Sequence, residues 1–181
     1  IARSASDEQK GQWLPRIAAG AIASPALPLD PAPGAVQLRR EGGDIVLSGV
    51  AGELIDADSA ALIILLARDE DCGLHRVVVD QDDGLALETS VLWDHGHRMS
   101  SLTLRDLRLP AERAFAVTEV AEAAVLAHAA LGLAAEAVGG SDGIIDITID
   151  YMKTREQFGR PIGSFQALKH RIANHRTEAV G

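Results

Sequence analysis

The sequence predicts an α+β protein in which a short helix, a strand-rich middle part and a long helical part follow one another along the chain. Three observations predict it: apolar residues recur at helical spacing within residues 7–18, short strand-like runs alternate with turn signals from about 35 to 115, and an alanine-rich apolar stripe begins after residue 117. The hydrophobic content of 47% over 181 residues is typical of a globular protein.

The first two predicted elements are a helix and a loop. Residues 7–18 begin with two acids and place apolar side chains on one helical face, so we expect a short helix that ends before Pro15 or Gly20. Residues 24–34 contain four prolines and a glycine, which predicts a loop because proline lacks the N–H that regular structure needs.

The middle part reads as a series of short strands. Each run is either alternately apolar and polar or continuously apolar and β-branched, and glycine or aspartate turn signals separate the runs. The expected strands are 36–40, 45–47, 62–67, 76–79 and 101–109. Short strands separated by turns in this way indicate a small antiparallel barrel or sandwich.

Residues 117–181 are predicted to be helical. The glycine-rich run 139–143 would break a helix by propensity, because each glycine costs about 1 kcal/mol relative to alanine. Paired glycines can also let another helix pack closely, so the residues alone leave this question open. A second helix is expected to begin near Ser164 as N-cap, with Pro161 ahead of it.

Composition excludes several classes of protein. The formal net charge of −9 argues against a nucleic-acid or anionic-membrane partner, since such surfaces need clustered cations. No uninterrupted stretch approaches the roughly 20 apolar residues of a membrane helix, so no membrane is expected. Cys72 is the only cysteine, which excludes an internal disulfide and favours a reducing compartment, the cytoplasm. Neither end resembles a natural terminus, so we expect the chain to be part of a longer protein.

The end of the chain departs from the acidic character of the rest. Residues 151–181 hold six cations and two acids, whereas the residues before 151 hold eleven cations and twenty-four acids. One interpretation is a solvated positive helix face. The other is an anion site, because Arg155 and Arg160 lie in the expected connection just ahead of a helix N-terminus, where guanidinium groups and free N–H groups can hold phosphate.

The same segment carries a family resemblance. Residues 151–166 read Tyr-Met-Lys-Thr-Arg-Glu-Gln-Phe-Gly-Arg-Pro-Ile-Gly-Ser-Phe-Gln, and this pattern closely resembles the C-terminal signature of acyl-CoA dehydrogenases. Residues 9–20, 94–115 and 138–153 also look like segments of that family. The resemblance therefore extends over the whole chain and is weaker before residue 90.

The resemblance implies a domain organisation. Residues 1–20 would end an N-terminal helical domain, 21–116 would form a middle antiparallel β-barrel, and 117–181 would begin an incomplete C-terminal four-helix bundle. It favours one continuous helix through the paired glycines. It also implies a homo- or hetero-oligomer, typically a tetramer, in which FAD lies between domains and across a subunit boundary.

The resemblance also implies an activity and cofactor contacts. The family introduces an α,β double bond into an acyl-CoA thioester and passes the electrons to an acceptor protein. By position, Arg155 would contact the FAD diphosphate of the neighbouring protomer, Phe158 would lie near the adenosine side, and Gln166 would be a second FAD contact.

Two flavin-facing segments depart from the family pattern. The family's Thr-Glu-Pro…Gly-Ser-Asp loop corresponds here to residues 24–34, where proline, alanine and leucine replace the polar donors. The next segment corresponds to residues 52–58, and the usual threonine is absent. These replacements remove side chains and N–H groups that would hold the chain's own flavin ring.

The substrate end departs from the pattern as well. Ala127 and Ala130 occupy the positions of an acid and an arginine that often hold CoA, and Ala129 occupies the position of the catalytic base in some members. In most members the base follows later than Gly181. No catalytic residue is therefore identified in this chain.

Two remaining features receive structural interpretations. His95 and His97 flank a glycine and are expected to face solvent, so no metal site is predicted. Trp93 is expected to pack under the barrel rather than stack on flavin.

Three hypotheses follow. The chain is a subunit of a heteromeric acyl-CoA dehydrogenase, of the kind that acts on bulky steroid-type substrates, and lends its signature to a partner's flavin. Alternatively it is an ordinary homomeric dehydrogenase with a divergent loop, or a catalytically silent structural relative.

Overall fold

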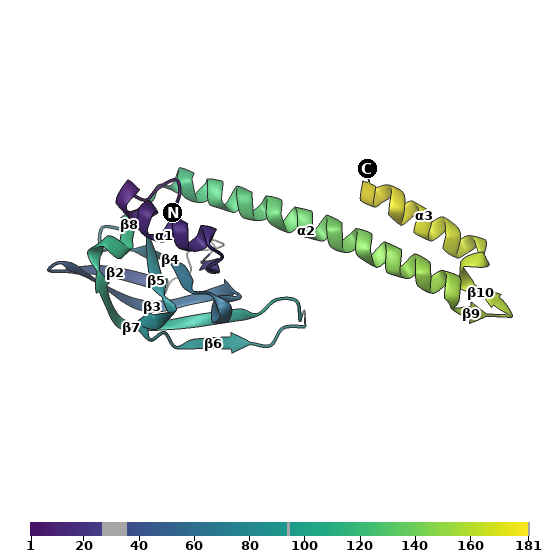
Figure 1. Cartoon of the computed structure of the whole chain (residues 1–181), viewed down its shortest axis with the longest axis horizontal. Helices are drawn as coiled ribbons and strands as arrows, with labels where there is room; N and C mark the ends of the chain where they lie inside the picture. The colour runs from purple at the N-terminus through teal and green to yellow at the C-terminus, as the bar shows by residue number, and fades with distance from the viewer. Residues whose placement is uncertain (27–35, 94, 181) are drawn as a thin grey trace. The chain divides into compact units, whose positions relative to one another are not determined.

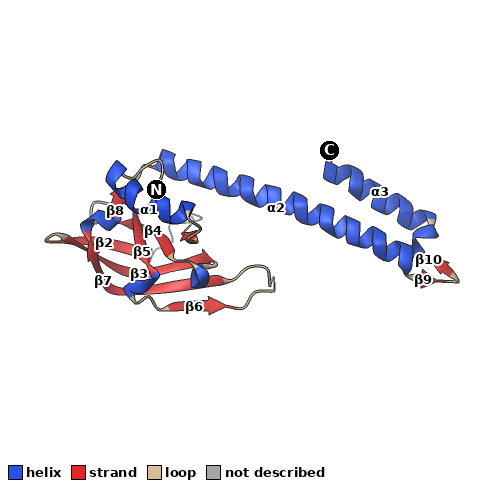
Figure 2. Cartoon of the chain, in the orientation of Figure 1, coloured by secondary structure: helices blue, strands red, loops and turns tan. Residues whose placement is uncertain are grey.

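The computed structural model describes residues 1–26, 36–93 and 95–180 (Figure 1). The chain divides into two compact units, Ile1–Leu126 and Ala127–Gly181, which are described separately. Most of the loop predicted at 24–34 lies outside the described residues. Helices and strands segregate along the chain, as expected for the α+β class (Figure 2).

The first unit begins with helix α1 (Asp7–Ala18), which continues through Pro15 and ends ahead of Gly20. Ser6 caps it: its hydroxyl accepts the Gln9 N–H, and the Gln9 side chain accepts the Ser6 N–H. Trp13 is fully buried and lies 6.2 Å, centroid to centroid, from the Phe115 ring.

Eight strands form one mixed sheet. The strands are β1 (Ala23–Pro25), β2 (Val36–Glu41), β3 (Asp44–Ile55), β4 (Leu62–Arg68), β5 (Leu74–Asp80), β6 (Leu87–Ser90), β7 (Met99–Pro110) and β8 (Ala114–Ala116). Seven follow the order β6-β7-β3-β2-β4-β5-β8, and β1 pairs with β4. The prediction of a wholly antiparallel sheet is wrong in one respect: β1 and β2 each run parallel to β4.

The core of this unit lies inside the curved sheet. Alternate residues of β2, β3, β4, β5 and β7 point into one cluster, as the period of a strand requires. The fully buried large side chains there include Leu38, Ile45, Leu47, Leu54, Ile63, Leu65 and Leu102. Trp93 is not among them. It is fully exposed between β6 and β7, so the expectation that it packs under the barrel is wrong.

Two helices dominate the rest of the chain. Helix α2 (Glu119–Thr154) is continuous through the glycine run, which confirms the family-based expectation over the propensity argument. Within that run, the Ser141 hydroxyl donates to the Ala137 carbonyl, and Arg176 of α3 (Gln166–Val180) pairs with Asp142 and Asp146 at 3.2 and 3.1 Å. Helix α3 begins at Gln166, one residue later than an N-cap at Ser164 predicts, because Ile162–Ser164 form a separate 3-10 turn, η4.

The expectation that no segment could cross a membrane is wrong for α2, which is long and apolar enough by length and composition. Among the Asp, Glu, Lys and Arg residues of the chain, only Glu136 falls within 123–141. Single polar residues such as His128 divide this stretch into short apolar runs. A search for uninterrupted apolar residues therefore misses a helix that is apolar on average and carries few charges. A helix that packs among other helices has the same composition, so this finding alone is a weak sign of a membrane.

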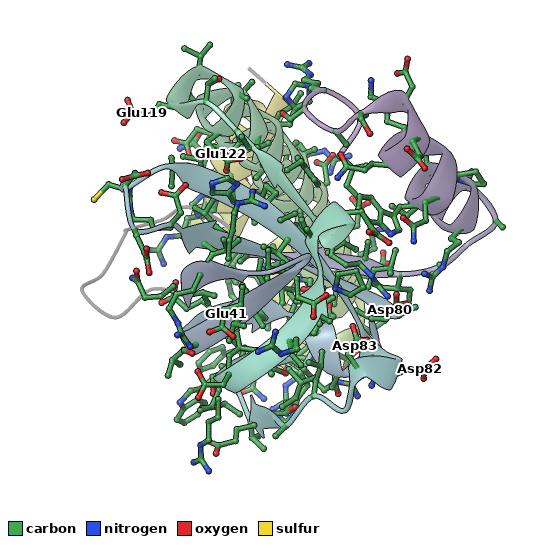
Figure 3. The ribbon with its side chains drawn as sticks, turned by 90° about the vertical axis from the view of Figure 1, so that its left-hand side faces the viewer. Glu41, Asp80, Asp82, Asp83, Glu119 and Glu122 are labelled. Carbon is green, nitrogen blue, oxygen red and sulfur yellow. The ribbon has the colours of Figure 1, made fainter. Side chains whose placement is uncertain are left out.

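Asp80 ties three elements of the first unit together. It ends β5, and its carboxylate accepts hydrogen bonds from Arg16 of α1 and Arg113 of the turn η3 (Ala111–Arg113), each at 2.6 Å. The Arg16 hydrogen bond, supported by Arg113, holds the pKa of Asp80 below its usual value. Figure 3 shows it beside the neighbouring acids Asp82 and Asp83.

We expect Asp80→Asn to lower the free energy of unfolding by about 1–2 kcal/mol at neutral pH, since both pairs are partly solvent-screened. A carboxyl whose folded pKa is depressed stabilises the fold above its unfolded pKa of about 3.9, and this contribution is lost as the pH falls further. Denaturant unfolding at pH 7 and below pH 4 should therefore show a difference that shrinks in acid. A difference independent of pH would contradict the assignment.

Candidate functional site

A tight hairpin connects α2 to α3. Strands β9 (Glu156–Gln157) and β10 (Arg160–Pro161) pair antiparallel, and Phe158 and Gly159 form the two-residue turn between them. Both turn residues have positive φ, 54° and 76°, as a type I′ turn requires. Glycine adopts this conformation freely, but a bulky residue such as phenylalanine is strained in it.

The hairpin is anchored to the end of α2 through backbone contacts. The Arg155 N–H donates to the Tyr151 carbonyl, and the Ile162 N–H donates back to the Arg155 carbonyl, each at 2.8 Å. At Gly163 a Cβ would lie 2.8 Å from the Met152 carbonyl oxygen, so only glycine lets η4 approach the helix this closely. These contacts fix the direction in which the hairpin leaves the helix.

Phe165 organises the side chains around the hairpin. The Phe158 ring meets it edge to face, with centroids 6.0 Å apart, and the Arg160 guanidinium lies 4.2 Å from its centroid. Phe158 nevertheless remains 91% exposed. The turn therefore leaves the aromatic ring of Phe158 exposed instead of burying it, although the backbone at this position is strained.

The predicted site residues Arg155 and Gln166 flank this hairpin on its two sides. Both are exposed; Arg155 follows the last turn of α2, and Gln166 is the first residue of α3. Among the described residues, no carboxylate forms an ion pair with Arg155, whereas nearby Lys153 pairs with Asp150 at 2.9 Å. The Gln166 amide lies 3.0 Å from the His170 ring nitrogen.

This donor set fits a diphosphate. Guanidinium groups form charge-assisted hydrogen bonds to phosphate oxygens, and the first N–H groups of α3 have no partner within the helix. The positive end of the helix dipole adds to the attraction. The anion-site interpretation of this segment is thus compatible with its geometry, and the individual FAD contacts of Arg155, Phe158 and Gln166 stay predictions.

The counterparts of the two flavin-facing segments are linked to each other. Ser24 is buried, and its hydroxyl donates to the Ile55 carbonyl at 2.7 Å. The Asp56 carboxylate accepts the Arg98 N–H at 3.0 Å, and this hydrogen bond lowers the pKa of Asp56. These polar groups are therefore already used within the protein, which fits the loss of ligand donors inferred from the sequence.

Sequence reasoning missed one polar arrangement in the first unit. Arg76 of β5 and Glu122 of α2 are 4% and 6% exposed and form a bidentate ion pair. The available signals were an arginine within a β-branched strand and a glutamate on an alanine-rich helix face. Each is unremarkable alone, and only the fold brings them together.

Comparisons with known proteins agree with the sequence resemblance. Residues 118–181 match the family model of the acyl-CoA dehydrogenase C-terminal domain. The acyl-CoA dehydrogenase FadE12 of Mycobacterium bovis is 29% identical over 198 residues, which covers 98% of this chain and 50% of that protein. The chain thus spans about half the length of the curated relatives it matches.

Solved structures show the same fold. A glutaryl-CoA dehydrogenase from Mycobacterium smegmatis in complex with FADH2 superposes with a TM-score of 0.86 at 29% identity, over 99% of this chain and 49% of that one. The ChsE4-ChsE5 complex from Mycobacterium tuberculosis gives a TM-score of 0.82 at 27% identity, again over 99% and 49%. The middle β-domain and the following helices predicted from the sequence are confirmed by these likenesses.

Because the backbone at Phe158 is strained, a substitution there can test whether the Phe158 ring is needed for the stability of the fold. Phe158→Asn should raise the free energy of unfolding by about 1 kcal/mol, because asparagine tolerates positive φ and the exposed ring contributes little packing. Thermal unfolding measures this. Cys72→Asn is the matched control: Cys72 is exposed at φ 64° outside the site and should show a similar gain. A loss of stability at Phe158 alone would show that the ring is needed for the fold.

Proposed function

We propose, since the chain belongs to the acyl-CoA dehydrogenase family, that it is a subunit of an FAD-dependent enzyme that introduces an α,β double bond into an acyl-CoA thioester. The observation that carries this proposal is the connection between α2 and α3. It combines an exposed Arg155 that pairs with no carboxylate among the described residues, an exposed Phe158 with a strained backbone, and Gln166 at the start of a helix.

Each of these residues has a task in binding. Arg155 and the first N–H groups of α3 would neutralise and orient the FAD diphosphate, Phe158 would offer its ring to the adenosine side, and Gln166 would add a directional amide contact. When bound, the flavin supplies the acceptor for the hydride that leaves the substrate β-carbon. A carboxylate must remove the α-proton, and the chain offers alanine at the candidate position, Ala129.

The flavin that this connection serves belongs to a neighbouring subunit in our proposal, and the neighbour is an unlike chain. Two observations favour a heteromer. The chain's own flavin-facing segments lack the family's usual side-chain donors, and the Ser24 hydroxyl is already hydrogen-bonded to the Ile55 carbonyl. Its CoA-holding positions are Ala127 and Ala130. One similar solved structure is that of the ChsE4-ChsE5 complex.

Two other functions compete with this proposal: an ordinary homomeric enzyme with a divergent loop, and a catalytically silent structural relative.

We further propose a cytoplasmic location, a tetrameric assembly and an electron-acceptor protein as the redox partner. The single exposed Cys72 is compatible with a reducing compartment.

The proposal is tested by the flavin content of the full-length protein, purified alone and together with the product of the neighbouring gene. We expect FAD only in the mixed complex. Arg155→Ala should raise the dissociation constant for FAD about 10- to 100-fold, because a charge-assisted hydrogen bond to phosphate is lost. Arg171→Ala removes an exposed cation from the middle of α3 and should leave FAD affinity unchanged.

The other outcomes separate the competing functions. One FAD per subunit in the protein purified alone would contradict the heteromer and favour the homomeric enzyme. Absence of FAD under both conditions would favour the silent structural relative.

A further inference from the structure

Besides its ion pair with Glu122, the buried Arg76 side chain also forms hydrogen bonds to backbone carbonyls. The Arg76 Nε and Nη2 groups donate to the two Glu122 oxygens, with the Nε bond at 3.0 Å. The remaining Nη1 group donates to the Ala26 carbonyl and, at 3.4 Å, to the Ile64 carbonyl. One guanidinium thereby joins α2, β4, β5 and the residue that follows β1.

Ala26 is held on both sides of its backbone. Its N–H donates to the Ile64 carbonyl at 2.9 Å, which continues the parallel pairing of β1 with β4, and its own carbonyl accepts from Arg76. Ala26 lies near the start of the counterpart of the family's flavin loop, residues 24–34, and is the last residue that the structure describes there. The point at which the chain leaves the sheet is therefore fixed by a side chain distant in sequence.

Glu122 orients the guanidinium. It lies in the first turn of α2, where its N–H donates to the Thr118 carbonyl at 3.0 Å. Figure 3 shows its side chain directed toward the strands, whereas that of Glu119 points away from them. A bidentate carboxylate restricts rotation of the guanidinium plane, so Nη1 can only face the carbonyls of Ala26 and Ile64.

The balance of desolvation and charge attraction indicates that the Arg76–Glu122 pair positions the backbone at Ala26 and adds little to stability. Removing two charges from water costs about as much as their attraction returns, and an apolar pair of similar volume is often equally stable. Such a pair would lack a donor for the Ala26 carbonyl. The distinctive contribution of Arg76 is thus the hydrogen bond to Ala26.

We propose that Arg76 is a positioning residue: held by Glu122, it fixes the start of the flavin-loop counterpart against the first turn of α2. It takes over an anchoring task for which residues 24–34 have few polar side chains of their own. The link to flavin rests on the proposed function, whereas the tie between Arg76 and Ala26 does not.

Hydrogen–deuterium exchange of the full-length protein tests the proposal with the double variant Arg76→Met/Glu122→Leu. We expect exchange in peptides covering Ala23–Pro25 and Ala26 to become about tenfold faster or more, with β3 and β7 unchanged. Glu122→Gln keeps one acceptor for Arg76 and should give a smaller increase in the same peptides. Arg113→Met is the control, because it breaks a partly buried pair that does not touch Ala26.

Unchanged exchange at Ala26 in the double variant would overturn the proposal, and so would a uniform increase over the whole first unit. FAD retention by the mixed complex is measured on the same samples and should fall. If Arg155→Ala has no effect on FAD while exchange at Ala26 still increases, the positioning role stands and the proposed function fails.

Discussion

The first unit depends on the pairing of β4 with three other strands. β4 runs antiparallel to β5 over its whole length and parallel to β1 and β2, and its residues Leu62, Ile63 and Leu65 are fully buried. The remaining residues of β4 are buried or half-buried and none is exposed, which explains why its sequence is an uninterrupted apolar run instead of an alternating one. Displacing β4 would separate the two halves of the sheet and remove the partner of β1.

The same strand connects the core to the start of the flavin-loop counterpart. Its Ile64 carbonyl accepts from both Ala26 and Arg76, so the register of β4 sets where the segment after β1 begins. A different principle operates between α2 and α3, where a short turn and a glycine contact hold the chain. The exit after β1 is fixed by the Arg76 side chain together with strand pairing, whereas the hairpin between α2 and α3 is fixed by backbone contacts.

The sequence predicted the class of fold, the strands β2, β3, β4, β5 and β7 and the location of the cationic connection, because these depend on local periodicity and on a long motif. The short strands β1, β6 and β8 were not predicted. It could not predict the Arg76–Glu122 pair, which joins residues distant in the chain. The exposed Trp93 was missed since large aromatic residues are usually buried. The hairpin at Phe158 was missed because that turn type ordinarily calls for asparagine or aspartate before glycine.

Helix α2 has a consequence for how the protein persists in solution. Leu131, Leu133, Val138, Ile144 and Ile147 are all more than half exposed on it. A helix apolar on several sides is stable only where another surface covers it. Where that surface belongs to another subunit, folding free energy is shared with association, so the melting temperature should rise with protein concentration, and unassembled chains would be prone to degradation.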